Sequence, residues 1–95
     1  MLPINSGRVA VFADKLWGYL GSDGKLAIKP QFNEAKSFRE GLAPVRRANL
    51  WGYIDVSGNM VIAEKFERAG DFASGSAIIV ASGSFGVIDK AGNYL

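Results

Sequence analysis

Hydrophobic and polar residues alternate along short stretches of this chain, with a period of two residues rather than 3.6. In the first third of the chain these stretches cover residues 8–12, 16–20 and 26–28, each bounded by glycine or a polar turn. Such alternation places successive side chains on opposite faces of a β-strand. Further strands of the same kind are expected at 42–47, 50–54, 60–63, 76–81 and 85–88, with a short one at 94–95. The pattern predicts an all-β chain.

The predicted strands recur at a fixed spacing of 34 residues. Trp17-Gly18-Tyr19 returns as Trp51-Gly52-Tyr53 and, with two substitutions, as Phe85-Gly86-Val87. The same offset relates three turn glycines, Gly24, Gly58 and Gly92. Because the glycine in the middle of each of these three-residue motifs has no side chain, we expect close backbone packing or a bulge there. Self-similarity of this kind indicates a repeat protein. We expect a single domain over residues 1–95, with units at about 7–40, 41–74 and 75–95.

Polar turns connect the second and third predicted strands of each unit. Asp55 and Gly58 are first and fourth in one turn, and Asp89 and Gly92 hold the same places in the next. This order favours a type I turn whose glycine takes the left-handed conformation. Turn capping explains both aspartates better than calcium binding, because no Asp-x-Asp cluster accompanies them. The first unit has Gly21 in place of the aspartate, so its hairpin is expected to be slightly looser.

The linkers between units, residues 29–40 and 64–74, carry apolar residues at every third position. These are Phe32, Ala35 and Phe38 in the first linker and Phe66, Ala69 and Phe72 in the second. The spacing predicts a short helical or 3₁₀ turn that places two phenylalanines on the neighbouring sheet. Pro30 and Pro44 are expected at strand borders or edges, where a missing N–H is tolerated.

The motif around each Trp-Gly-Tyr step extends well beyond three residues. Residues 16–45 read LWGYLGSDGKLAIKPQFNEAKSFREGLAPV, and residues 50–80 read LWGYIDVSGNMVIAEKFERAGDFASGSAIIV. The chain resembles the WG-repeat (KWG-repeat) family, whose pattern runs approximately W-G-Y-I-D-x-x-G, an apolar pair, then P-x-F-x-x-A-x-x-F-x-E-G-L-A-x-V. This resemblance implies a β-rich repeat array without catalytic residues, in a family of many bacterial proteins that is generally of unknown role. Departures are concentrated in the third unit, as is common in terminal repeats.

Together these patterns predict a tandem repeat of three-stranded antiparallel β-meanders. Both an open solenoid-like array and propeller-like blades fit the spacing. Propellers usually close with about four to eight blades, so three units would complete a ring only by dimerisation or with further repeats. We favour the open or partly curved array.

The sequence contains neither cysteine nor histidine. Disulfides, thiolate chemistry, Ser-His-Asp triads and histidine metal sites are therefore excluded. An enzyme that uses carboxylates alone, as glycosidases do, is a minor alternative. Its candidate groups are the turn aspartates and the linker glutamates Glu34, Glu40, Glu64 and Glu67. We expect a protein that is not an enzyme, with no cofactor and no bound metal.

The start of the chain has no basic segment followed by a long apolar run. No apolar stretch reaches the length of about 18 residues that a membrane span needs. We therefore expect no signal peptide and no membrane partner. The compartment is left open, with the cytoplasm as the default.

Four basic residues are the best polar candidates for a binding surface: Lys36, Arg39, Arg46 and Arg47. Guanidinium groups can pair with carboxylate or phosphate. The net charge is only +2, which gives no strong nucleic-acid signal, so a protein partner is expected. Residues 1–47 carry a net charge of +4 and residues 48–95 carry −2. Complementary halves and exposed repeat edges also make a homo-oligomer a reasonable expectation.

The aromatic residues of the repeat suggest a second type of ligand. Trp17 and Trp51 would let a sugar ring stack, as in a glycan- or cell-wall-binding protein. Their apolar flanks favour packing in the core or between units instead. The same role is expected for Tyr19 and Tyr53, which lie on the same side of their strands. The preferred function is a binding or scaffolding module for protein–protein interaction, and glycan binding through the tryptophans is the alternative.

Overall fold

The computed structural model describes residues 5–95, and no helix occurs within them. The strands are β1 (Val9–Ala13), β2 (Leu16–Leu20), β3 (Leu26–Phe32), β4 (Glu34–Ala35), β5 (Ala43–Arg47), β6 (Leu50–Ile54), β7 (Met60–Phe66), β8 (Arg68–Ala69), β9 (Ser76–Ala81) and β10 (Ser84–Asp89). Three strands have the predicted bounds, five differ at one or both ends, and β4 and β8 were not predicted as strands. The strand predicted at residues 94–95 is wrong, because Tyr94 forms only an isolated bridge with Ile88.

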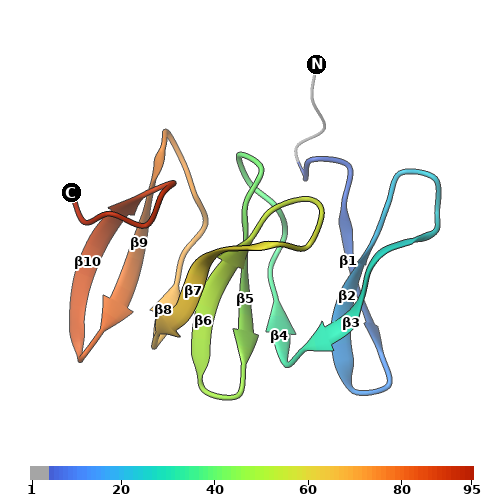
Figure 1. Cartoon of the computed structure of the whole chain (residues 1–95), viewed down its shortest axis with the longest axis horizontal. Coiled ribbons are helices and arrows are strands. Elements are labelled where there is room, and N and C mark those ends of the chain that lie inside the picture. Colours follow the sequence, from blue (N-terminus) through green and yellow to red (C-terminus); the bar gives the residue numbers. More distant parts are fainter. Residues whose placement is uncertain (1–4) are drawn as a thin grey trace.

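These strands form three antiparallel sheets that lie in a row (Figure 1). The first sheet has the order β1-β2-β3, the central sheet β4-β5-β6-β7 and the third sheet β8-β9-β10. The first and third sheets lie at opposite ends of the row, so the described chain is open and not a closed ring. The predicted all-β array of antiparallel meanders is confirmed.

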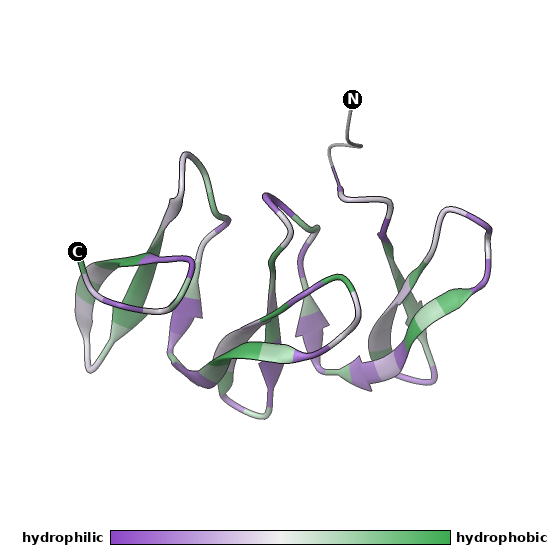
Figure 2. Ribbon diagram, turned by 45° about the horizontal axis from the view of Figure 1, so that its top comes forward, coloured by the Kyte–Doolittle hydropathy of each residue, from purple (hydrophilic) through white to green (hydrophobic). Residues whose placement is uncertain are grey.

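The linkers between the units are extended, and the predicted helical or 3₁₀ turns are wrong. β4 pairs with β5 and β8 pairs with β9, so each linker adds a short strand to the sheet that follows it. Figure 2 shows these two short strands in the purple of hydrophilic residues. Pairing satisfies linker backbone groups that one isolated helical turn would leave free. The N–H of Asn33, for example, donates to the carbonyl of Arg46 at 2.8 Å.

The two prolines occupy different environments. Pro30 lies in the edge strand β3, where the register against β2 shifts, as expected. Pro44 is the second residue of β5 and lies just beyond the residues that pair with β4, so it too is near a strand border, as expected. The N–H of Lys36 donates to the Pro44 carbonyl at 3.0 Å. The return bond of an antiparallel pair is missing, and the Lys36 carbonyl accepts the Tyr19 hydroxyl at 2.7 Å instead.

Two hydrophobic clusters fill the spaces between adjacent sheets. We call the contact between the first and central sheets the first junction, and that between the central and third sheets the second junction. The first cluster contains Tyr19, Ile28, Phe32, Phe38, Ala43, Val45 and Ile54. The second contains Leu42, Trp51, Tyr53, Ile62, Phe66, Ala69, Phe72, Ala77, Ile79 and Ile88. Each sheet is therefore stabilised mainly by its neighbours, as in other repeat proteins.

Candidate functional site

The tyrosines of the repeat motif tie each sheet to the linker that follows it. Tyr19 and Tyr53 are both fully buried. Their hydroxyls donate to the carbonyls of Lys36 and Gly70, each at 2.7 Å. Burial raises the pKa of both phenols well above its ordinary value, and for Tyr53 the nearby carboxylate of Asp71 adds to the effect. These are structural residues, as expected.

The strand glycines allow two backbones to come into contact. A Cβ on Gly18 would lie 2.5 Å from the carbonyl oxygen of Ile28, and one on Gly52 would lie 2.6 Å from that of Ile62. Such distances are shorter than van der Waals contact, so only glycine fits. Gly86 in the third sheet has a different neighbour, because its Cβ would lie 2.9 Å from the ring of Tyr94. The predicted close backbone packing is confirmed in the first two units.

The turn aspartates cap the hairpins, as expected. Oδ1 of Asp55 accepts the N–H groups of residues 57 and 59, and Oδ1 of Asp89 accepts those of residues 91 and 93. These hydrogen bonds, led by that from Asn93, lower the pKa of Asp89. The first hairpin lacks the aspartate, yet its closing bond from Gly24 to Gly21 is 3.0 Å, as it is between residues 58 and 55. It is therefore not looser by this measure.

The turn glycines differ in what surrounds them. Gly24, Gly58 and Gly92 all have positive φ, at 81°, 90° and 89°. A Cβ on Gly58 would lie 3.3 Å from the side chain of Ile28, and one on Gly92 would lie 3.2 Å from that of Ile62. Nothing lies within 4 Å of a Cβ on Gly24. The second and third hairpins therefore pack on the preceding unit, whereas the first has no such neighbour among residues 5–95.

The tryptophans are not equivalent. Trp51 is only 7% exposed. Trp17 is partly buried, and its ring lies 5.2 Å from that of Phe12, which is 58% exposed. Phe85, at the same repeat position, is 83% exposed. Packing between units, which we expected of both tryptophans, therefore holds most fully for Trp51.

A groove of about 640 Å³ lies at the second junction. We call it the intersheet groove. Its lining comes from β4, β5 and β6 of the central sheet and from the linker that contains β8. The lining residues are Glu34, Lys36, Arg46, Trp51, Glu67, Arg68, Ala69 and Gly70.

Lys36 connects the two sheets across this groove. Its Nζ lies 5.1 Å from the centre of the Trp51 ring and donates to the carbonyl of Ala69 at 2.9 Å. A cation over an indole face is attracted by the ring quadrupole. The ammonium is thus held in place by the aromatic face on one sheet and the backbone of the next.

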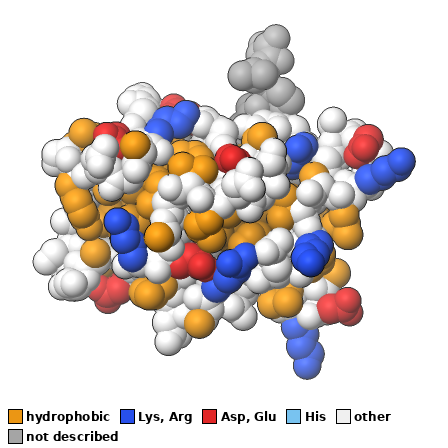
Figure 3. Space-filling model, viewed as in Figure 1, with side chains coloured by type: hydrophobic (Ala, Val, Ile, Leu, Met, Phe, Trp, Pro, Cys, Tyr) orange, Lys and Arg blue, Asp and Glu red, His pale blue; other side chains and the backbone are white. Residues whose placement is uncertain are grey.

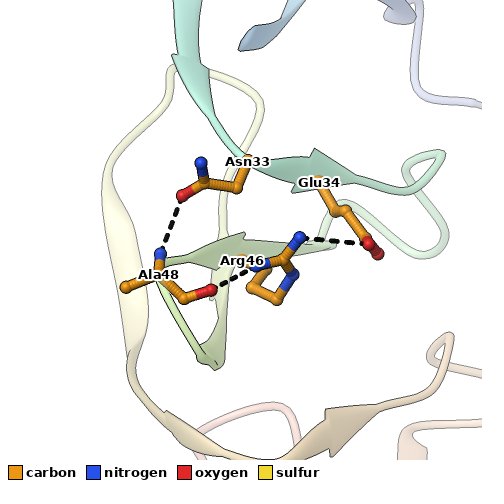
Figure 4. A network of polar contacts seen from close by, with 4 residues as sticks. All are labelled: Asn33, Glu34, Arg46 and Ala48. Carbon is orange, nitrogen blue, oxygen red and sulfur yellow. Dashed lines mark hydrogen bonds and ion pairs between the residues drawn. The ribbon is translucent and has the colours of Figure 1, made fainter. Parts of the chain in front are cut away.

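Arg46 is held by a polar network at the edge of the groove (Figure 4). Its Nη2 lies 3.1 Å from Oε1 of Glu34, and its Nη1 donates to the carbonyl of Ala48. The N–H of Ala48 donates to Oδ1 of Asn33 at 2.7 Å. The guanidinium is therefore oriented by a carboxylate from β4 and by the turn that follows β5.

The linker that contains β8 contributes one carboxylate with a hydrogen-bond partner and one cation without a partner among residues 5–95. Oε1 of Glu67 accepts the N–H of Gly83 at 2.6 Å. Arg68 is exposed and makes no hydrogen bond or ion pair through its side chain within residues 5–95. The groove thus has three cations, two of them already engaged, and two carboxylates that both have partners.

Comparison with known families identifies the repeat. A sequence model of the family described as WG containing repeat matches residues 17–51 and again residues 51–82. The chain belongs to the WG-repeat family. Searches of curated proteins and of solved structures found no match. The buried tyrosines and the strand glycines Gly18 and Gly52 described above lie within the residues that the family model matches.

The four basic residues predicted as one surface of the WG repeats lie in different places. Lys36 and Arg46 both line the intersheet groove. Arg47 points to the opposite face of β5, with its guanidinium 4.9 Å from the centre of the Phe32 ring and 3.6 Å from Oε1 of Glu64. Arg39 donates to the carbonyl of Phe38 in a turn. The structure therefore brings together two of the four.

Three charged lining residues were not predicted as part of this surface: Glu34, Glu67 and Arg68. Glu34 and Arg68 occupy the same repeat position with opposite charges, which is a signal that the sequence does contain. Glu40 was also not predicted to link two successive units. Its carboxylate accepts the N–H groups of Ser74 and Gly75, one repeat later, at 2.7 and 3.0 Å.

The rest of the described surface is mixed in character. Basic and acidic side chains are interspersed on the face shown in Figure 3. Within residues 5–95, no three side chains of the metal-binding types are grouped in one place. The same part of the chain contains no helix long and apolar enough to span a membrane.

Proposed function

We propose that this WG-repeat chain is a non-catalytic protein-interaction module whose intersheet groove binds an acidic segment of a partner protein. The observation that carries the proposal is Arg68, an exposed guanidinium without a partner within residues 5–95, in a groove with two further cations. Arginine pairs with a carboxylate through two parallel hydrogen bonds. An acidic side chain of a bound segment would supply that partner.

The neighbouring cations favour binding because they are already ordered. Lys36 is fixed by Trp51 and the Ala69 carbonyl, and Arg46 by Glu34. A preorganised group loses little conformational freedom when a ligand arrives. Binding of an acidic ligand therefore requires little further ordering of the Lys36 and Arg46 side chains.

The groove carboxylates support a binding role over an acid–base role. Glu34 is paired with Arg46, and Glu67 holds the turn at Gly83. Both therefore act as structural contacts that shape the groove.

A peptide library displayed on phage and selected against the chain would test the proposal. We expect the selected peptides to be rich in Asp and Glu. Isothermal titration of one of them should show that Arg68→Glu weakens binding roughly tenfold or more, since a like charge replaces the pairing partner. Lys25→Glu makes the same change in net charge at an exposed site outside the groove lining and should leave binding unchanged. Equal loss in both variants, or selected peptides without acidic residues, would contradict the proposal.

A second candidate rests on the exposed aromatic pair at the first junction. Phe12 is 58% exposed and lies against the partly buried Trp17, so this pair offers more ring surface than Trp51 does. A saccharide could stack there. Titration with saccharides and muropeptides should then change the tryptophan fluorescence of the wild type but not that of Trp17→Phe. A fluorescence signal that stays constant throughout would exclude glycan binding at this site.

A further inference from the structure

The two junctions inside the chain show how one WG-repeat sheet docks on the next. One side of each sheet, which we call its forward face, presents the motif aromatics. The opposite side, its rear face, presents small and β-branched residues. At the first junction Tyr19 and Phe38 pack against Val45 and Ile54 of the central rear face. At the second junction residues shifted by 34 positions make the same contact.

No other part of the described chain covers the forward face of the third sheet. Phe85 pairs with Val80, and Val87 with Ile78, so these four side chains share one face. Phe85, Ile78 and Val87 are 83%, 60% and 39% exposed. In Figure 3 hydrophobic side chains reach the surface at this end of the row. The equivalent positions of the central sheet are Trp51, Pro44 and Tyr53, and all three are buried at the second junction.

At the other end of the row, nothing among residues 5–95 covers the rear face of the first sheet. Val9 occupies the repeat position of Ala43 and is 53% exposed, whereas Ala43 is fully buried. Leu26, on strand β3 at the other edge of this sheet, is 55% exposed, and both residues are opposite Leu20 of β2. The turn at Gly24, whose equivalents pack on the preceding unit, has no such neighbour in the part of the chain that the structure describes. Residues 5–95 therefore present one forward face and one rear face, the two halves of a contact that they form twice internally.

We propose that the forward face of the third sheet binds the rear face of the first sheet in a second copy of this chain. The contact would continue the geometry of the internal junctions across two molecules. Since the two faces differ, the association is head-to-tail and extends into chains of copies rather than closing as a symmetric dimer.

Sedimentation velocity over a range of concentrations tests this proposal with two blocked variants. Phe85→Lys blocks the forward face and Val9→Lys blocks the rear face, because burying an unpaired ammonium is costly. Both positions are exposed, so each monomer should keep its circular dichroism spectrum and melting temperature. Val61→Lys, at a 45% exposed position of the central sheet, is the matched control. Ile78→Lys replaces Phe85→Lys if that variant does not fold.

We expect the mass of the wild type and of Val61→Lys to rise with concentration, whereas each blocked variant sediments as a monomer. An equimolar mixture of the two blocked variants should form a 1:1 complex of twice the monomer mass and stop there, since one intact face of each kind remains. A wild type that stays monomeric at every concentration would overturn the proposal. So would a blocked variant that still dimerises alone, because that result requires contact between like faces.

Discussion

The two junctions of this molecule share an interior but differ on the outside. At both, a buried tyrosine hydroxyl donates to a linker carbonyl at 2.7 Å, and a phenylalanine ring lies 4.9 Å from the tyrosine ring at 65°. At the outer margin the first junction presents Phe12 against Trp17. The second presents Arg46 at the same repeat position, with Lys36 across Trp51.

This difference separates the residues that build the repeat from those available for binding. The interior positions recur because each must fit the neighbouring sheet, and a change there would disturb the packing. The marginal positions Phe12 and Arg46 lie outside the two hydrophobic clusters, so they can differ between units without affecting the packing of the interior. The second junction is charged and the first is aromatic for this reason, and the binding specificity of a WG-repeat array is expected to reside in such positions.

The largest effect is expected from removing the linker phenylalanines. Phe38 and Phe72 are buried against a tyrosine ring, so replacing either with alanine leaves a cavity. Phe38→Ala and Phe72→Ala should each lower the free energy of unfolding by about 3–5 kcal/mol. Because the two interiors are alike, we expect similar losses, measured by urea unfolding. A loss at one junction more than twice that at the other would show that the interiors are not equivalent.

The strand glycines should come next. Gly52→Ala places a methyl group 2.6 Å from the carbonyl oxygen of Ile62, so the backbone must shift, at a cost of roughly 3 kcal/mol. Gly21→Ala is the control, because its Cβ meets the flexible carboxylate of Asp23 at 3.2 Å. Thermal melting of both variants would measure the contrast, and equal melting temperatures would refute the account of close backbone packing.

A smaller effect is expected at the turn glycines, where the first hairpin differs from the second. Gly24→Ala and Gly58→Ala both impose a positive φ on alanine, at a cost of about 1 kcal/mol. Gly58→Ala must also displace the Ile28 side chain, and so should be the more destabilising of the two. Urea unfolding that gave the opposite order would contradict the packing of this hairpin on the preceding unit.

The smallest effect concerns the dependence of stability on pH. The folded-state pKa of Asp89 lies below its ordinary value of about 3.9, because backbone N–H groups, first that of Asn93, stabilise the carboxylate. The resulting stabilisation is present above the unfolded-state pKa and is lost as pH falls through the folded-state value. Between neutral and acidic pH, the melting temperature of Asp89→Asn should therefore fall less than that of the wild type. Parallel melting curves at every pH would contradict this assignment.

Most of the fold could be predicted from the sequence because its determinants are local. Alternation and the 34-residue offset locate the strands, and three of them have the predicted bounds. The linkers could not be predicted in this way. Spacing at every third residue resembles a 3₁₀ turn, but the linker phenylalanines reach the core from an extended chain that pairs with the next sheet.

The candidate site was predicted in part. Lys36 and Arg46 do lie together, but Arg47 is adjacent to Arg46 on a strand and therefore points to the other face. Alternation alone would have separated these two arginines. The contribution of Arg68 depends on how the third sheet stacks on the central one, and no local pattern specifies that stacking.

The most direct test of where binding resides is the titration of ¹⁵N-labelled chain with a selected acidic peptide, followed by amide and indole chemical shifts. If the groove at the second junction is the binding site, the largest shifts will fall on Arg68, Ala69, Gly70 and the indole N–H of Trp51. Amides near Phe12 and the indole of Trp17 will change little. Shifts concentrated at the first junction, or spread evenly over both, would contradict the assignment of binding to the intersheet groove.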